Sequence, residues 1–225
     1  MNPQNPTHIA IILDGNRRYA KKLSLQPWKG HEFGKNKVNE VLDYAKELGI
    51  NQLTFYTLSI ENLKRPESEL NQLFRLMKQA FQELDNKKIH ENQVKIKFLG
   101  DLNLIPEELQ KLCKELEEKT KNNNKFILNF CIAYGGRQEI IQAVKKIVDN
   151  GQEITEDSIQ KNLYLQDEPD LIIRTGGQIR TSNFLPWQST YSEWFFLDKL
   201  WPEFEKQDLI ECIEEFKNRK RNFGR

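Results

Sequence analysis

The sequence predicts an α/β fold, in which helices surround a mostly parallel central β-sheet. Two observations support this: apolar runs of about six residues recur along the chain, and amphipathic stretches with helical spacing lie between them. Strands that alternate with helices in this way are joined by crossovers and run parallel. No repeat, low-complexity tract or linker divides the 225 residues, so we expect a single domain over residues 1–225.

The predicted strands are five apolar runs. In chain order they are HIAIIL (8–13), LTFYTL (53–58), VKIKFL (94–99), FILNFC (126–131) and DLIIR (170–174). Short runs dominated by apolar residues are typical of strands that are mostly buried.

The predicted helices fill the intervals between these strands. The clearest apolar stripe runs from Leu70 to Leu84 in steps of three and four residues. A helix of about 23 residues starting near Glu67 would be roughly 35 Å long. Its apolar residues are core by default, but a helix of that length would also serve as the wall of a deep apolar cleft or product tunnel. The same period predicts a helix over 109–116, and looser stripes predict further helices over 32–48, 137–148 and 207–218.

Composition excludes several classes of protein. The chain has 34 basic and 33 acidic residues, and this balance argues against a protein that mainly binds nucleic acid. No apolar run is long enough to span a bilayer and the first residues do not form a secretory signal, so we expect a cytoplasmic protein. Cys113, Cys131 and Cys212 have apolar neighbours and are expected in the core. The scattered histidines argue against a zinc hydrolase.

The loop after the first strand is the first candidate site, because ligands of such sheets bind outside the carboxyl ends of the strands. It reads Asp14-Gly15-Asn16-Arg17-Arg18. A carboxylate, a glycine that lets the backbone approach a ligand, and two guanidinium groups suit a magnesium-bound phosphate or diphosphate. The alternative is an Asp N-cap followed by solvated arginines. The sequence contains no P-loop and no GxGxxG after this strand.

The loop after the second strand carries Ser59, Asn62 and Arg65 before Pro66. Ser59 and Asn62 offer hydrogen-bonding groups to a substrate, and Arg65 is long enough to reach a phosphate. The alternative is a loop that only leads into the next helix, with Pro66 near its first turn.

The loop after the fifth strand places Arg174 and Arg180 on either side of paired glycines, with Ser182 following. Arginine presents a fork of donors that matches phosphate oxygens, and glycines expose backbone N–H groups to an anion. A simple turn would not need both arginines, so this loop is predicted to bind an anion.

Taken in order, these motifs resemble those of the cis-prenyltransferases, the family of undecaprenyl diphosphate and dehydrodolichyl diphosphate synthases. The DGNRRYAKK form is closer to the archaeal and eukaryotic branch, because bacterial members commonly have Gly and Trp where this chain has Arg17 and Tyr19. The resemblance covers almost the whole chain, through HIAIILDGNRRYAKK, Gly30-His31, LSIENLKRP, FLGD, NFCIAYGGRQEI, PDLIIRTGGQIRTSNFLPWQ, SEWFF and LWPEF.

The resemblance implies a magnesium-dependent transferase. Such an enzyme joins isopentenyl diphosphate units, head to tail and with cis double bonds, to an allylic diphosphate primer, and yields a polyprenyl diphosphate. Asp14 matches the magnesium-binding aspartate, and Glu193 matches a carboxylate near the metal and the subunit interface. Ser59 and Asn62 match residues near the reacting ends of the substrates, where Asn62 is expected to assist proton removal.

The resemblance also divides the substrate-binding residues between two diphosphates. The allylic diphosphate site is implied for Gly15, Asn16, Arg18 and His31, with Arg17 and Arg65 as further candidates from their loops. The isopentenyl diphosphate site is implied for Arg174, Arg180 and Ser182.

Some positions depart from the family pattern. Pro27 stands where many members have an arginine, Gln178 and Ile179 replace a common Glu followed by His or Gln, and the terminal RxG signature reads Asn222-Phe223-Gly224. These departures leave open a short-chain or branched, non-head-to-tail synthase of the same fold. A non-catalytic partner subunit typically lacks the first aspartate, whereas Asp14 is present.

The aromatic-rich segment SEWFFLDKLWPEF (Ser192 to Phe204) bears on whether the protein forms a dimer. Its aromatic residues suit either a buried edge strand or an interface anchor, and the family resemblance implies a homodimer in which the C-terminal residues 219–225 assist the partner's substrate site. Because the product tail is apolar, transient contact with a membrane surface is also expected.

Overall fold

The computed structural model describes residues 5–84 and 87–220. Its strands form one parallel sheet in the order β3-β4-β2-β1-β5-β6. They are β1 (His8–Ile12), β2 (Gln52–Ser59), β3 (Val94–Leu99), β4 (Phe126–Tyr134), β5 (Leu171–Arg174) and β6 (Glu193–Phe196). This confirms the predicted α/β fold, and it puts β1 at the centre between β2 and β5.

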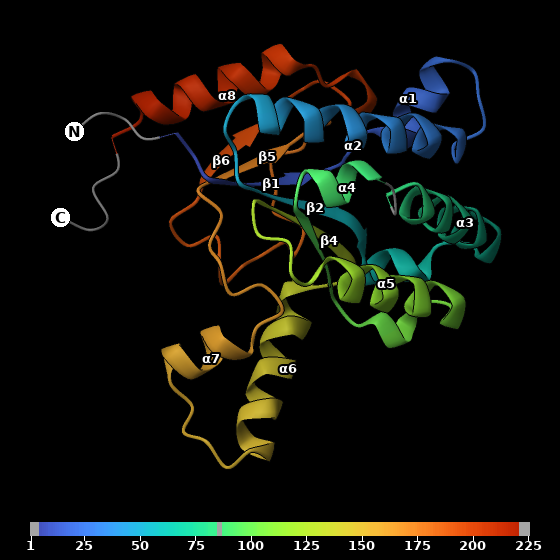
Figure 1. The fold of residues 1–225 in the computed structure, drawn as a ribbon. Coiled ribbons are helices and arrows are strands. Elements are labelled where there is room, and N and C mark those ends of the chain that lie inside the picture. Colours follow the sequence, from blue (N-terminus) through green and yellow to red (C-terminus); the bar gives the residue numbers. More distant parts are fainter. Residues whose placement is uncertain (1–4, 85–86, 221–225) are drawn as a thin grey trace.

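Helices cover the sheet and extend beyond it (Figure 1). They are α1 (Asn16–Lys22), α2 (Lys29–Glu47), α3 (Glu67–Leu84), α4 (Lys87–Glu91), α5 (Glu107–Thr120), α6 (Gly136–Asp149), α7 (Glu156–Asn162) and α8 (Lys206–Asn218). Figure 1 shows α6 and α7 reaching away from the body of the molecule. In the described ranges, no helix is both long and apolar enough to cross a bilayer.

The two faces of the sheet have separate cores. Alternate residues such as Ile11 and Phe55 pack into a large cluster with buried side chains of α2, α3, α5 and α8. On the opposite face, Ile12 and Tyr56 belong to a smaller cluster completed by Phe184 and Leu185, which come from a loop. The predicted strands are mostly buried, although Lys95 and Lys97 of the edge strand β3 are partly exposed, and the three cysteines are buried free thiols.

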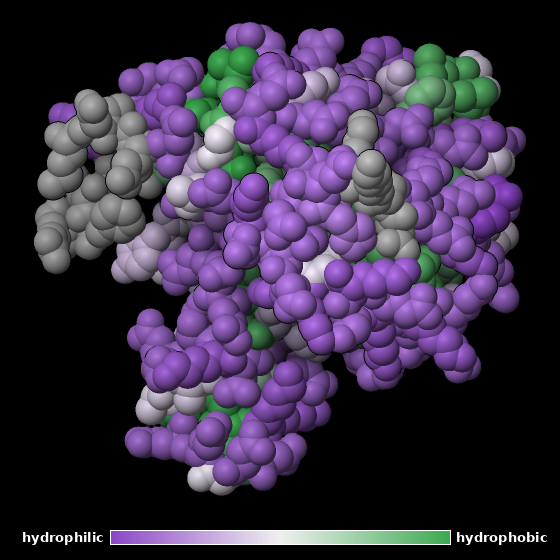
Figure 2. Space-filling view, viewed as in Figure 1, coloured by the Kyte–Doolittle hydropathy of each residue, from purple (hydrophilic) through white to green (hydrophobic). Residues whose placement is uncertain are grey.

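One predicted length was wrong. The helix starting at Glu67 has 18 residues instead of about 23, so α3 is about 27 Å long. The aromatic segment after residue 192 matches the edge strand that its composition allowed. It forms strand β6 at one edge of the sheet, and Trp201 and Phe204 are fully buried in the large core. Trp194 and Phe196 are half-buried and stack on each other at the sheet edge. The surface in Figure 2 is mostly hydrophilic, with small apolar patches.

Candidate active site

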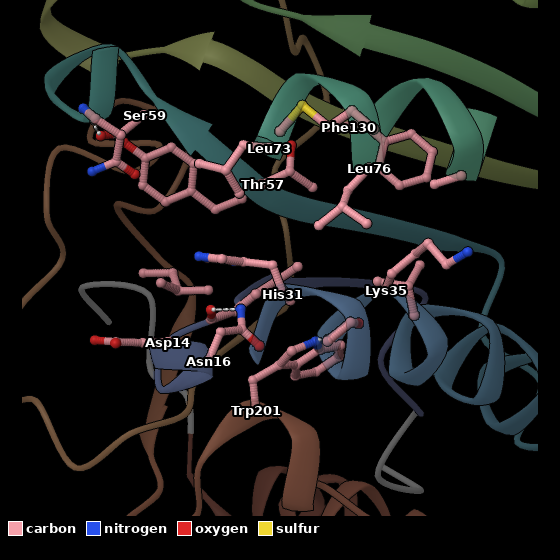
Figure 3. A pocket seen from close by; sticks show the side chains of 18 of the residues that line it. Asp14, Asn16, His31, Lys35, Thr57, Ser59, Leu73, Leu76, Phe130 and Trp201 are labelled. Carbon is pink, nitrogen blue, oxygen red and sulfur yellow. Dashed lines mark hydrogen bonds between the residues drawn. The ribbon is translucent and has the colours of Figure 1, made fainter. Parts of the chain in front are cut away.

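The loops after β1, β2 and β5 meet at one edge of the sheet. The register pairs Ile12 with both Tyr56 and Arg174, so the residues that follow these strands lie close together in space. They border a cavity of about 400 Å³. In Figure 3, Asp14, Asn16 and His31 lie on one side of this cavity and Thr57 and Ser59 on the other.

Asp14 is held by two arginines at the mouth of the cavity. Its carboxylate accepts a hydrogen bond from Arg174 Nη2 at 2.9 Å and another from Arg18 Nη2 at 3.2 Å. Arg174 is 4% exposed, and its Nη1 donates to Ser182 Oγ at 2.7 Å and to the carbonyl of Arg180 at 2.6 Å. Arg174 therefore joins the loop after β1 to the loop after β5.

Backbone geometry explains why two positions close to Asp14 are occupied by glycine. Gly15 has a φ of 114°, and a Cβ there would meet the backbone of Leu200 at 2.9 Å. Gly176 has a φ of 87°, and its Cβ would meet Arg18 Nη2 at 2.4 Å. Gly15 is also the N-cap residue of α1, and no side chain caps that helix. Asp14 is thus not a helix cap, and its carboxylate faces the cavity.

Asn16 and His31 present polar atoms that lack a protein partner. Asn16 Oδ1 and His31 Nε2 are buried without a hydrogen bond, although both residues line the cavity. Burial, followed by the charges of Arg65 and Arg17, lowers the pKa of His31 to about 4. His31 is therefore neutral near pH 7, and these two atoms are free to bind a polar ligand.

Arg17 and Arg65 lie on a second pocket of about 400 Å³ that shares Asp14, Asn16 and His31 with the first. Glu69 of α3 links them: its carboxylate accepts a hydrogen bond from Arg65 at 3.2 Å and lies 3.8 Å from Arg17. Sequence reasoning did not single out Glu69. The four-residue spacing between Arg65 and Glu69, about one helical turn, could have indicated an ion pair between them.

Ser59 and Asn62 lie on one short turn over the cavity. Ser59 Oγ accepts a hydrogen bond from the backbone N–H of Asn62 at 3.2 Å, which begins the 3-10 turn Ile60–Lys64. Both residues line the cavity, as does Tyr56. The hydroxyl of Tyr56 donates to the carbonyl of Ser182 at 3.2 Å, and burial raises its pKa well above the ordinary value. Tyr56 was missed because a tyrosine inside an apolar run is indistinguishable from core.

The deeper part of the cavity is apolar and lies between α2 and α3. Lys35 of α2 reaches across to Glu83 of α3, with Nζ at 2.9 Å from both carboxylate oxygens. The apolar side chains that line this part are Val38, Leu73, Leu76, Met77, Ala80, Phe81, Leu84 and Phe130. One face of the predicted long helix is thus a cavity wall as well as core.

Arg180 lines the cavity from an exposed loop. Its Nη1 donates to the side-chain oxygen of Gln178 at 2.6 Å. Gln178, which stands where the family pattern commonly has a Glu, therefore gives this arginine a neutral partner. Ile179 points into solvent and is 83% exposed. Pro27 is an exposed residue of the loop between α1 and α2.

Glu193 is not brought to Asp14 within this chain. As the first residue of β6, it shares a row with Leu171 and Ile9, near the opposite ends of the strands. Its carboxylate accepts a hydrogen bond from Arg219 at 2.8 Å. A metal-binding role for Glu193 would need a second copy of the chain and stays a prediction. Residues 221–225, including the Asn222-Phe223-Gly224 signature, lie outside the described residues.

The donor set fits a metal ion that is bound mainly by its substrate. Among described residues, no group of three or more His, Cys, Asp or Glu side chains is placed to hold a metal. Asp14 supplies one carboxylate at the cavity mouth, next to several arginines. Magnesium is commonly held by one or two carboxylates together with substrate phosphates, so Asp14 suits that role once a diphosphate is present.

Comparison with known proteins gives one consistent result. A family model described as "Putative undecaprenyl diphosphate synthase" matches residues 12–224. A tritrans,polycis-undecaprenyl-diphosphate synthase (geranylgeranyl-diphosphate specific) of Methanopyrus kandleri is 45% identical, over 98% of this chain and 85% of the relative.

Two solved structures share the fold over nearly their whole length. Lavandulyl diphosphate synthase from Lavandula x intermedia, in complex with dimethylallyl diphosphate, has a TM-score of 0.90 and 32% identity, covering 98% of this chain and 99% of that one. A probable undecaprenyl diphosphate synthase from Campylobacter jejuni has a TM-score of 0.86 and 32% identity, covering 99% and 100%.

Proposed function

The chain belongs to the undecaprenyl diphosphate synthase family of prenyltransferases, and on that premise we propose that it elongates an allylic diphosphate with isopentenyl diphosphate through cis double bonds. The observation that carries the proposal is the two-part cavity. Arginines and Asp14 border one end, and apolar side chains of α2 and α3 line the other. This arrangement suits a substrate with a diphosphate head and a growing hydrocarbon tail.

The polar end would hold the two diphosphates. Asn16, Arg18 and His31 face the allylic diphosphate, together with the backbone of Gly15, and Arg17 and Arg65 add positive charge from the adjoining pocket. Arg180 and Ser182 face the isopentenyl diphosphate. Arg174 contacts both Asp14 and Ser182 and so fixes the spacing of the two sites.

Charge stabilisation at this end would drive the first chemical step. As the carbon–oxygen bond of the allylic substrate breaks, negative charge develops on the departing diphosphate, and fixed arginines stabilise it without rearrangement. Asp14 would hold Mg²⁺, which when bound supplies further neutralisation of the diphosphate charge.

Ser59 and Asn62 border the region where the two reacting carbon ends would meet. The double bond of isopentenyl diphosphate attacks the allylic carbon, and loss of one proton then leaves the new cis double bond. An amide is too weak a base to keep that proton. The role we assign to Asn62 is therefore to orient the group that accepts it, while the apolar walls keep water away from the cation.

The relatives suggest the primer. The Methanopyrus kandleri protein is named as specific for geranylgeranyl diphosphate, and we infer the same primer here. The test is to incubate the protein with Mg²⁺, labelled isopentenyl diphosphate and primers of several lengths, and to resolve product length and branching. A ladder of linear products, formed best from geranylgeranyl diphosphate, is expected. Products of a single condensation, or branched products, would overturn the proposal.

A second candidate function is a branched or short-chain condensation. The similarity to lavandulyl diphosphate synthase favours it, as do the departures at Gln178 and Ile179 near Arg180. The higher identity to the archaeal relative, 45% against 32%, favours elongation. Incubation with dimethylallyl diphosphate alone tests the branched reaction, because only the joining of two allylic units gives a condensed product without isopentenyl diphosphate. A short-chain reaction is recognised instead by a single short product when isopentenyl diphosphate is supplied.

We also propose a homodimer. Trp194 and Phe196 are half-buried and stacked at the sheet edge, and a symmetric partner would bury the same patch on both copies. Arg219 already pairs with Glu193 and Glu215 of its own chain. Removal of residues 219–225 is expected to impair catalysis more than folding. A monomer at micromolar concentration, fully active without that tail, would contradict the assembly.

A further inference from the structure

The corner formed by α1, the following loop and the start of α2 exposes apolar side chains. Leu23 is 45% exposed, Leu25 is 42% exposed, and Phe33 of α2 is 38% exposed. Phe33 packs edge-on against Tyr19 with ring centroids 5.2 Å apart, and Trp28 is half-buried beside them in sequence. Figure 2 shows apolar surface at the outer end of α1, at the upper right. Single exposed leucines are ordinary, but a group of this kind marks an interaction surface.

Backbone hydrogen bonds hold the two leucines at the tip of the loop. The N–H of Leu25 donates to the carbonyl of Ala20 at 2.9 Å, and that of Leu23 to the carbonyl of Tyr19 at 3.2 Å. Ser24 between them has a φ of 57°. Loop tips are normally polar because they face water. This loop instead presents Leu23 and Leu25 to solvent in a defined conformation, so little ordering is needed when they are buried by a partner.

The charge of the same corner indicates the kind of partner. From Tyr19 to Phe33 the chain has three lysines and one acidic residue, Glu32. Lys22 pairs with Glu203 and Lys29 with Glu32, while Lys21 makes no ion pair with any described carboxylate. Lys29 Nζ also lies 4.5 Å from the ring centre of Trp28. Leucine and tryptophan flanked by lysine is the composition of segments that lie in the interface of a bilayer with anionic lipids.

We propose that this corner, Tyr19 to Phe33, docks the protein onto the surface of an anionic lipid bilayer. Leu23 and Leu25 enter the boundary between head groups and acyl chains, and Lys21 lies at the level of the lipid phosphates. Leu23 follows Arg18 by five residues, about 8 Å along α1, so docking would hold the polar end of the cavity next to the bilayer. The inference rests on the exposed surface and does not require the proposed reaction.

Vesicle co-sedimentation without any substrate tests the docking surface. The wild-type chain is mixed with vesicles of phosphatidylcholine alone and with vesicles that also contain phosphatidylglycerol. Binding to the anionic vesicles is expected to weaken more than about tenfold in the double variant Leu23→Ser/Leu25→Ser, and about fivefold in Lys21→Gln. The matched control is Val148→Ser/Ile154→Ser. These residues are 58% and 52% exposed and lie in α6 and in the segment between α6 and α7, which reaches away from the body of the molecule (Figure 1). The control should bind as the wild type does.

Three results would overturn the docking surface. They are no binding of the wild type to anionic vesicles, equal binding to vesicles of phosphatidylcholine alone, and equal loss in the control variant. The first result would mean that the exposed leucines bind a protein or nothing. Circular dichroism melting of each variant shows that a loss of binding does not come from unfolding. Product formation in detergent-free solution, measured on the same samples, separates failure of the docking surface from failure of the proposed reaction.

Discussion

The two ends of the cavity are built in different ways. The polar end takes side chains from three loops far apart in sequence, such as Asp14 and Arg174, which are 160 residues apart and hydrogen-bonded at 2.9 Å. The apolar end is lined largely by one face of α3 and the facing part of α2. The polar end thus depends on the register of the sheet, whereas the apolar end depends on the spacing of two helices. Substitutions at the polar end should therefore change substrate binding and bond breaking, and substitutions at the apolar end should change product length.

The largest expected effect is at Asp14. Asp14→Asn keeps the shape and removes the negative charge that we assign to Mg²⁺ binding. Turnover at saturating substrate should fall by at least about a hundredfold, measured by incorporation of labelled isopentenyl diphosphate. Asp157→Asn, on an exposed residue of α7, is the matched control. Near-normal turnover of Asp14→Asn at saturating Mg²⁺ would remove the metal role.

Arg180 should have the next largest effect. It is exposed, so Arg180→Ala is not expected to disturb the core. Loss of one charge-assisted contact to a diphosphate costs about 2 kcal/mol, which raises KM for isopentenyl diphosphate about thirtyfold. Steady-state kinetics with each substrate varied in turn measures this. An effect confined to the allylic primer would show that the division of the two diphosphate sites is wrong.

His31 makes the stability of the polar end depend on pH. Burial and nearby arginines lower its pKa to about 4, against 6.5 for an exposed histidine. Between these values the unfolded chain binds more protons than the folded one, so the free energy of unfolding falls as pH drops from 6.5 toward 4. We expect a loss of about 2 kcal/mol from His31 between pH 7 and pH 4.5.

Urea denaturation at several pH values measures that loss. His31→Gln should reduce the pH dependence without abolishing it, because burial also lowers the pKa of His8 to about 4. An unchanged pH dependence in His31→Gln would contradict the buried, neutral state of this histidine.

The ion pair between Lys35 and Glu83 should have the smallest effect on stability. Glu83 is 56% exposed, and pairs of this kind contribute less than about 1 kcal/mol. Lys35→Met keeps the alkyl stem but removes the contact that bridges α2 and α3 over the cavity. We expect a melting temperature close to that of the wild type and a shift toward longer products in chain-length analysis. Unchanged product length would mean that the contact between Lys35 and Glu83 does not limit how far the product extends into the apolar end of the cavity.

Much of the polar end could be predicted from sequence, because its residues follow strands and the ends of parallel strands share one edge. Asp14, Ser59 and Arg174 were found in this way. The apolar end could not be separated from core: Leu73 and Phe81 fill a helical stripe whether they face a sheet or a cavity. Strand β6 has four residues, which is too short for a periodic pattern of apolar residues to separate a strand from an interface segment. Helix α7 was missed, although Thr155 and Ser158 form a capping box at its start.

We propose that the growing chain lies against α3, between α3 and α2. Ala80 lines the cavity, whereas Gln79 beside it is exposed on the outer side of α3. The decisive measurement is the product-length distribution of Ala80→Phe and Gln79→Phe, each supplied with Mg²⁺, isopentenyl diphosphate and geranylgeranyl diphosphate. Ala80→Phe should give shorter products with the first condensation little changed, and Gln79→Phe should match the wild type. Equal distributions for both variants would contradict this placement of the product, because the chain would then grow elsewhere.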